Sequence, residues 1–90
     1  MWQLAAGQQL RYRVWDDEGV VYNDLSGDTH LLGAPAMHLL LTLRAAPAGA
    51  PALAEALRAA IEVDPADDLH AAVAGLLAEL QALALIEALP

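Results

Sequence analysis

Ser26, Asp28 and His30 are the residues of this chain whose types could carry out hydrolysis, because a serine, a histidine and an acid form the triad of serine hydrolases. Their spacing argues against that chemistry. A nucleophile, its base and the orienting acid must converge, whereas alternating residues of one hairpin lie side by side. The Gly-x-Ser-x-Gly turn that exposes many hydrolase nucleophiles is missing as well. We therefore interpret the first two as turn residues and the histidine as a strand residue, and we expect a protein that is not an enzyme.

A metal site would have to use the three histidines, His30, His38 and His70, together with Asp67 or Asp68. These residues do not reproduce a recognised ligand spacing, such as a His-x-x-x-His pair on one helix. The chain contains no cysteine, so thiolate ligands, disulfide bonds and thiol catalysis are excluded. We expect no metal ion and no cofactor.

Two other stretches have compositions that could bind a cation or a phosphate. Residues 16–18 are consecutive acids, but they stand before Gly19 in a run that is typical of a solvated turn. Residues 46–51 contain two prolines and one glycine, and they lack the lysine and the glycine spacing of a phosphate-binding loop. Neither stretch predicts a site.

The charge of the chain argues against nucleic-acid and membrane partners. Its 90 residues, which we interpret as a single domain over 1–90, include twelve acids, four arginines and no lysine, for a net charge of -8. Nucleic-acid binding is driven mainly by basic residues that neutralise phosphates, so this chain should be repelled. The N-terminus lacks the basic segment of a signal peptide, and the longest uncharged run, 29–43, is too short to span a bilayer. We expect a soluble cytoplasmic protein.

Patterns of period two predict three strands, over about 9–15, 20–23 and 29–32. The last two form a hairpin whose turn contains Gly27, which can adopt a positive φ. A turn centred on Ser26 would pair Tyr22 with His30 and Val21 with Leu31. One face of the hairpin would then carry Val20, Tyr22, His30 and Leu32, and the other Val21, Asn23, Thr29 and Leu31. The N-terminal Trp2 and Leu4 could cover part of one face.

Three helices are predicted after the hairpin, over about 35–45, 51–61 and 65–83. Each begins at a proline, which suits the first helical position because its missing N–H would be unpaired there. Asp64 is a suitable N-cap for the third helix, whose leucines recur with a period of 3.6 residues. Residues 85–86 could close the domain as a short extended segment. The predicted fold class is α+β, a three-stranded antiparallel meander followed by three helices, similar to a winged helix.

The third strand of this meander should lie at an edge of the sheet, because the chain leaves it as a helix. An edge strand presents unpaired N–H and C=O groups that can pair with a guest strand. A groove between that edge and the apolar third helix would bind a peptide by strand addition.

The sequence resembles PqqD-like proteins, and within them the small members found with HPr kinase-related systems. The resemblance covers roughly residues 10 to 87 and is carried by 21–23, by the Ser-Gly-Asp-Thr-His-Leu-Leu segment 26–32, and by Ala36 and 39–40. The 26–32 segment is fairly specific, whereas the leucine-rich helices are not. The Asp-Gly turn common after the first helix of PqqD is replaced here by residues 44–49.

The resemblance implies a non-catalytic peptide chaperone, or leader-peptide recognition element. Such a module docks a precursor peptide as an extra strand between strand three and helix three, and presents it to a modifying enzyme such as a kinase-like or radical SAM protein. In PqqD itself the peptide is the precursor of pyrroloquinoline quinone. In this chain, the resemblance implies that the peptide-binding residues are Thr29, His30, Leu31, Leu32, Leu69, Ala72, Val73 and Leu76.

Two alternatives come from other classes of protein. The second and third predicted helices could imitate the helix-turn-helix of a winged-helix nucleic-acid binder, although the third carries acids and no basic residue. The edge strand or an apolar surface could instead pair with a second copy, which would make the chain a dimerisation module.

Overall fold

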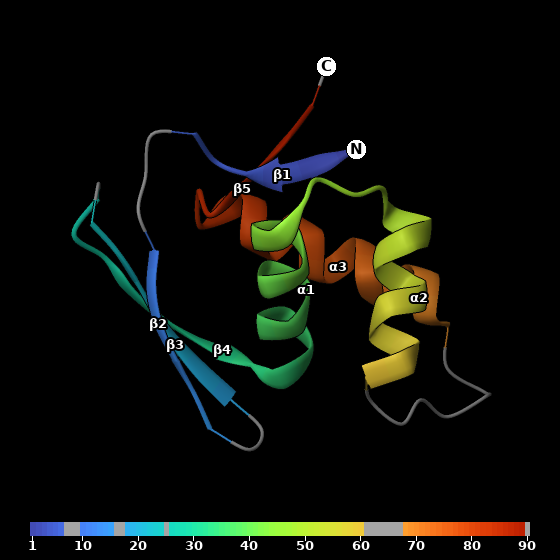
Figure 1. Cartoon of the computed structure of the whole chain (residues 1–90), viewed down its shortest axis with the longest axis horizontal. Coiled ribbons are helices and arrows are strands. Elements are labelled where there is room, and N and C mark those ends of the chain that lie inside the picture. Colours follow the sequence, from blue (N-terminus) through green and yellow to red (C-terminus); the bar gives the residue numbers. More distant parts are fainter. Residues whose placement is uncertain (7–9, 16–17, 25, 61–67, 90) are drawn as a thin grey trace.

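The protein is described by a computed structural model of the chain, which covers residues 1–6, 10–15, 18–24, 26–60 and 68–89 (Figure 1). Its elements are β1 (Trp2–Leu4), β2 (Leu10–Val14), β3 (Glu18–Asn23), β4 (Thr29–Gly33), α1 (Ala34–Ala45), α2 (Ala50–Ala60), α3 (Leu69–Ala82) and β5 (Ile86–Ala88). The predicted α+β class, an antiparallel three-stranded sheet ahead of three helices, is confirmed. A second, two-stranded sheet accompanies it.

The larger sheet has the strand order β2-β3-β4, so β2 and β4 are its two edges within the part of the chain described. The turn between β3 and β4 has the expected chemistry. Gly27 adopts a φ of 77°, which a residue without a Cβ tolerates at little cost. The Asn23 N–H donates to the Asp28 carbonyl at 2.9 Å, and the Gly27 N–H donates to the Asn23 carbonyl at 2.8 Å.

The predicted register of this hairpin is wrong by one residue. Tyr22 lies opposite Thr29, and Val21 lies opposite His30. The innermost pair of the turn is formed by Asn23 and Asp28, so the loop is one residue shorter than a turn centred on Ser26 requires. Because side chains alternate along a strand, this shift exchanges the faces assigned to β4 relative to β3.

The inner face of the sheet therefore combines Val21 with His30 and Leu32, and it packs on α1. Gly19 of β3 lies directly under Met37 of α1. A Cβ at Gly19 would overlap the Cγ and Sδ atoms of Met37, so only glycine allows the strand and the helix to approach this closely.

Helices α1 and α2 each begin one residue before the proline at which the sequence predicts their start, so the proline is their second residue. The predicted start of α3 near residue 65 is wrong, because the helix begins at Leu69. Asp68 is its N-cap: the side chain accepts a hydrogen bond from the Ala71 N–H at 3.1 Å. Asp64, which the sequence favours as the cap, lies outside the described residues.

The core lies where the three helices meet the inner face of β3 and β4. Leucine supplies most of its volume, as a chain rich in alanine requires. Its buried members are Val21, Leu32, Ala36, Met37, Leu39, Leu40, Leu43, Leu53, Ala54, Leu57, Leu69, Val73, Leu77, Leu80, Leu85 and Ile86. No helix in the described residues is long and apolar enough to cross a bilayer.

Both ends of the chain meet in the smaller sheet. Trp2 of β1 lies opposite Ala88 of β5, and Trp2 also bridges to Ala48 in the segment between α1 and α2. The Gln3 side chain donates to the Glu87 carboxylate at 2.8 Å. Trp2 and Leu4 pack on the helical core, so the expectation that they cover a face of the three-stranded sheet is wrong. The extended segment expected at 85–86 is confirmed at Ile86, where β5 begins, whereas Leu85 lies in the bend before the strand.

Candidate functional site

Ser26, Asp28 and His30, which resemble a hydrolase triad, are part of the hairpin formed by β3 and β4. The Ser26 Oγ accepts a hydrogen bond from the Asp28 N–H at 3.3 Å, which stabilises the turn. His30 is half-buried on the inner face, and its Nε2 has no hydrogen-bond partner among the described residues. In this part of the chain the three side chains therefore form no proton relay.

The histidines do not form a metal centre in the described ranges. His30 lies in β4, His38 in α1 and His70 in α3. Among the residues whose positions are described, no three histidine or acidic side chains gather closely enough to hold a metal ion. Asp67, the other acid considered as a ligand, lies outside these ranges.

The free edge of β4 is the feature that can bind another chain. In an antiparallel pair, opposite residues alternate between pairs that exchange backbone hydrogen bonds and pairs that do not. The bond from the Asn23 N–H to the Asp28 carbonyl fixes this alternation between β3 and β4. It directs the backbone groups of His30 and Leu32 toward β3. The N–H and C=O groups of Thr29, Leu31 and Gly33 therefore point away from the sheet.

The four predicted strand residues fall on both faces of this edge. Thr29 and Leu31 lie on the outer face with exposed side chains, and Leu31 is 67% accessible to solvent. Leu32 is buried beneath α1, and His30 is half-buried beside it. The backbone of Gly33, which the sequence-based set omits, extends the edge by one residue; the strand runs up to the first residue of α1 without a break.

The four predicted helix residues are also divided by burial. Leu69 and Val73 are core residues, with 7% and 1% of their surface exposed. Ala72 is exposed and Leu76 is half-buried, so these two present surface at one flank of the buried stripe. They are four residues apart, and side chains at this spacing are neighbours on a helix.

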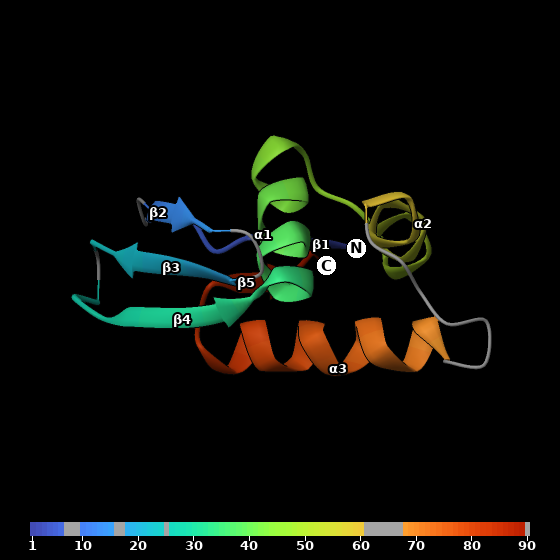
Figure 2. The same ribbon diagram turned by 90° about the horizontal axis from the view of Figure 1, so that it is seen from below.

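Helix α1 connects the two halves of the candidate site. It packs on β3 and β4 on one side and on α2 and α3 on the other. In Figure 2, β4 is the strand of its sheet drawn nearest to α3, and β2 is at the opposite edge. In this view the edge of β4 and the C-terminal part of α3, drawn in red, lie on the same side of α1.

The other edge of the sheet, β2, is also free of a partner strand in the described residues. The Trp15 N–H donates to the Glu18 carbonyl at 2.8 Å, which directs the backbone groups of Leu10, Tyr12 and Val14 outward. The Arg44 guanidinium lies 5.4 Å from the centre of the Tyr12 ring, so the end of α1 covers this edge strand on its inner face.

Comparisons with known proteins agree with this architecture at the level of the fold. No protein-family model and no curated relative matches the chain. The solved structure of TbiB1 in complex with the TbiA(beta) leader peptide is similar over 98% of this chain and 98% of that chain, with a TM-score of 0.71 and 19% sequence identity. At this identity the likeness establishes a shared fold.

Proposed function

We propose that this chain is a non-catalytic peptide-binding module that recognises the leader segment of a precursor peptide. The observation that carries the proposal is the free edge of β4, whose outward N–H and C=O groups at Thr29, Leu31 and Gly33 match the hydrogen-bonding pattern of an added strand. The shared fold with TbiB1, a protein solved with a leader peptide, supports it.

In this proposal the peptide pairs with β4 as an antiparallel strand and lies beside α3. The backbone of β4 supplies the register. Thr29, Leu31, Ala72 and Leu76 contact the peptide with their exposed surface. The buried Leu32, Leu69 and Val73 and the half-buried His30 shape the floor beneath it. Because main-chain pairing is largely independent of sequence, selectivity comes from the side chains along α3.

The PqqD-like character of the 26–32 segment extends the proposal to a partner enzyme. The chain would hold the leader while a modifying enzyme, such as a kinase-like or radical SAM protein, acts on another part of the precursor.

The exposed flank of α3 allows a matched test of the binding site. Ala72→Asp places a charge where the peptide would lie, whereas Ala74→Asp makes the same change at an exposed position that the 3.6-residue period turns away from that flank. Candidate precursor peptides encoded beside this gene would be titrated by calorimetry. We expect Ala72→Asp to weaken binding by about tenfold or more, because an unpaired charge facing apolar groups costs at least ~1.4 kcal/mol. Equal affinity in both variants would contradict the site.

A further inference from the structure

The outer face of the three-stranded sheet, the side turned away from the helices, carries large apolar side chains that face solvent. Trp15 is 52% exposed, Tyr22 is 38% exposed and Val20 is half-buried. A shallow depression of about 260 Å³ is lined by these three residues together with Arg11, Tyr12 and Arg13. Burying aromatic and aliphatic surface favours association, so this face is a candidate contact surface for another protein.

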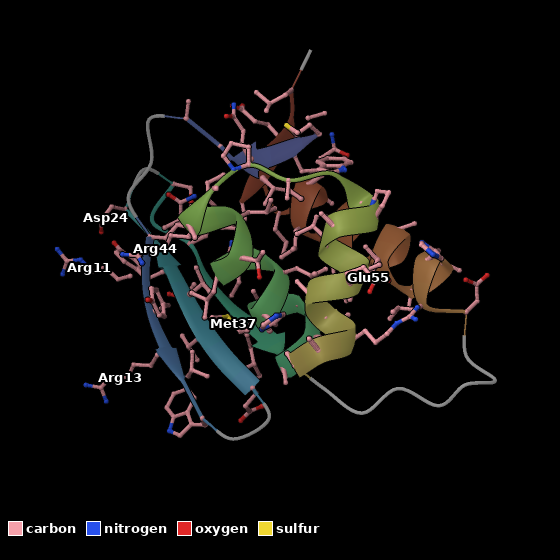
Figure 3. All side chains as sticks on the ribbon, turned by 45° about the vertical axis from the view of Figure 1, so that its right-hand side comes forward. Arg11, Arg13, Asp24, Met37, Arg44 and Glu55 are labelled. Atoms are coloured by element: carbon pink, nitrogen blue, oxygen red, sulfur yellow. The ribbon has the colours of Figure 1, made fainter. Side chains whose placement is uncertain are left out.

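The charges of the outer face cancel, in contrast to those of the whole chain. Arg11 and Arg13 of β2 lie on this face, as do Glu18 of β3 and Asp24, the residue that follows β3. Figure 3 shows Arg11 and Arg13 pointing away from the helices, on the side of the sheet opposite to Met37. Two arginines and two acids balance, so the net charge of -8 is carried by the other residues. Two copies of an acidic chain can meet at a neutral face with less repulsion than at an acidic one.

Arg13 and Glu18 are the charged groups of the outer face that are available to a partner. Arg11 already pairs with Asp24, with 3.6 Å between the Nε and Oδ2 atoms. Neither Arg13 nor Glu18 forms an ion pair with another of the described residues, and both side chains are exposed. The face therefore offers one positive and one negative group, which is a pattern that a second copy of the same face can complement.

The strand register arranges four residues of this face as two crossing diagonals. The Trp15 N–H donates to the Glu18 carbonyl at 2.8 Å, so these two residues lie opposite each other, and Arg13 lies opposite Val20 in the next pair on this face. One diagonal joins the apolar Trp15 and Val20, and the other joins the charged Arg13 and Glu18. A two-fold axis that lies in the interface along the apolar diagonal places Trp15 and Val20 each against its own copy. The same axis places Arg13 of each copy against Glu18 of the other.

We propose that the outer face binds a second copy of this chain, and that the symmetric dimer is held by the apolar diagonal and by two Arg13–Glu18 ion pairs. A partner whose charge has a single sign fits less well, because this face presents both signs. The three strands are five or six residues long, so the face is small beside the roughly 800 Å² per partner of a standard interface. We therefore expect a weak dimer, with a Kd of about 10 µM to 1 mM. The backbone groups at the β4 edge remain open to a leader peptide in this dimer.

The two tryptophans make this contact measurable by NMR in the full chain. As the protein is concentrated from about 20 µM to about 1 mM, the Trp15 indole N–H signal should move, because more of the chain becomes dimeric. The Trp2 indole signal, in the smaller sheet, should stay in place. A Trp15 signal that does not depend on concentration over this range would overturn the proposal.

Exchanging the charges of one diagonal supplies the sharper test. Arg13→Glu leaves two acids on the charged diagonal, and Glu18→Arg leaves two arginines. In sedimentation equilibrium, each variant alone should associate about tenfold or more weakly than the native chain, because like charges then meet. An equimolar mixture of the two variants should recover association to within about threefold, because each acid then meets an arginine.

Arg58→Glu is the matched control for net charge. It makes the same change as Arg13→Glu at an arginine of α2 that has 57% of its side chain exposed, and it should alter self-association by less than about twofold. Circular dichroism verifies that each variant is folded. Undiminished self-association of Arg13→Glu, a mixture that stays monomeric, or an equal loss in Arg58→Glu would each overturn the proposal.

Discussion

Leu31 lies opposite Val20 at a position where the two strands exchange no backbone hydrogen bonds. The Leu31 side chain is therefore on the outer face, and its N–H and C=O groups point away from the sheet. Leu31 can therefore contact a guest strand in two ways, through the hydrogen bonds of its backbone N–H and C=O groups and through its exposed apolar side chain. Substitutions at Leu31 can therefore measure separately how much the backbone and the side chain contribute to peptide affinity.

Leu31→Pro tests the backbone contribution. Proline removes the outward N–H but no hydrogen bond within the sheet, and edge strands tolerate it for that reason. We expect peptide affinity to fall by about tenfold or more, because the variant loses at least one main-chain hydrogen bond to the peptide and the hydrogen bond next to it. Leu31→Ala keeps the N–H and should lose less. Calorimetry on both variants, with circular dichroism to verify folding, makes the comparison; undiminished binding by the folded proline variant would exclude strand addition at β4.

The close approach of Gly19 to Met37 predicts a sensitivity of the fold. Gly19→Ala should destabilise the protein by about 1–3 kcal/mol, because the new methyl group overlaps the Met37 side chain. This cost exceeds the gain of about 0.4–1 kcal/mol from restricting the unfolded chain. Gly75→Ala on α3, where a Cβ meets nothing within 4 Å, should instead stabilise by about 0.5–1 kcal/mol. Urea denaturation measures both, and a neutral Gly19→Ala would show that β3 and α1 are not this close.

Asp68 should stabilise the start of α3 through its cap. Asp68→Ala removes the acceptor for the Ala71 N–H, and we expect a loss of about 0.5–2 kcal/mol in the free energy of unfolding. Asp68→Asn keeps an acceptor oxygen and should be close to neutral. Equal stability of the alanine and asparagine variants in thermal unfolding would mean that the helix begins elsewhere.

The winged-helix alternative predicts nucleic-acid binding, and the charge of the chain predicts its absence. Within the described residues α3 contains Glu79 and no arginine or lysine, so it cannot release counterions from phosphates. We expect no gel shift of duplex DNA at micromolar protein and physiological salt. A complex that weakens steeply as salt rises would support the nucleic-acid alternative instead.

The order of the three-stranded sheet and the three helices, and the position of the edge strand, could be predicted from local patterns, whereas β1 and its pairing with β5 were not predicted. The alternation around Tyr12, the turn chemistry at Gly27 and the helical period of the leucines each depend on nearby residues alone. The register of the hairpin depends on the number of loop residues, and the sequence around Ser26 is compatible with either count. A one-residue difference was enough to place His30 on the inner face instead of beside Tyr22.

The division of the candidate site into surface and core could not be predicted for a different reason. Periodicity identifies Leu69, Ala72, Val73 and Leu76 as one broad stripe, but it does not show where α1 and α2 cover that stripe. Val73 proved to be a core residue, so a charge there would test folding rather than binding. Trp15 belongs to an alternating pattern that is visible in the sequence, but that pattern does not show that its side chain is 52% exposed.

The most direct test of strand addition at β4 is amide hydrogen exchange, residue by residue, with and without a bound precursor peptide. The N–H groups of Thr29, Leu31 and Gly33 should become protected on binding, whereas those of His30 and Leu32 should change little because β3 already accepts their hydrogen bonds. Protection that appears instead at Leu10, Tyr12 and Val14, or that does not alternate along β4, would contradict the proposed site.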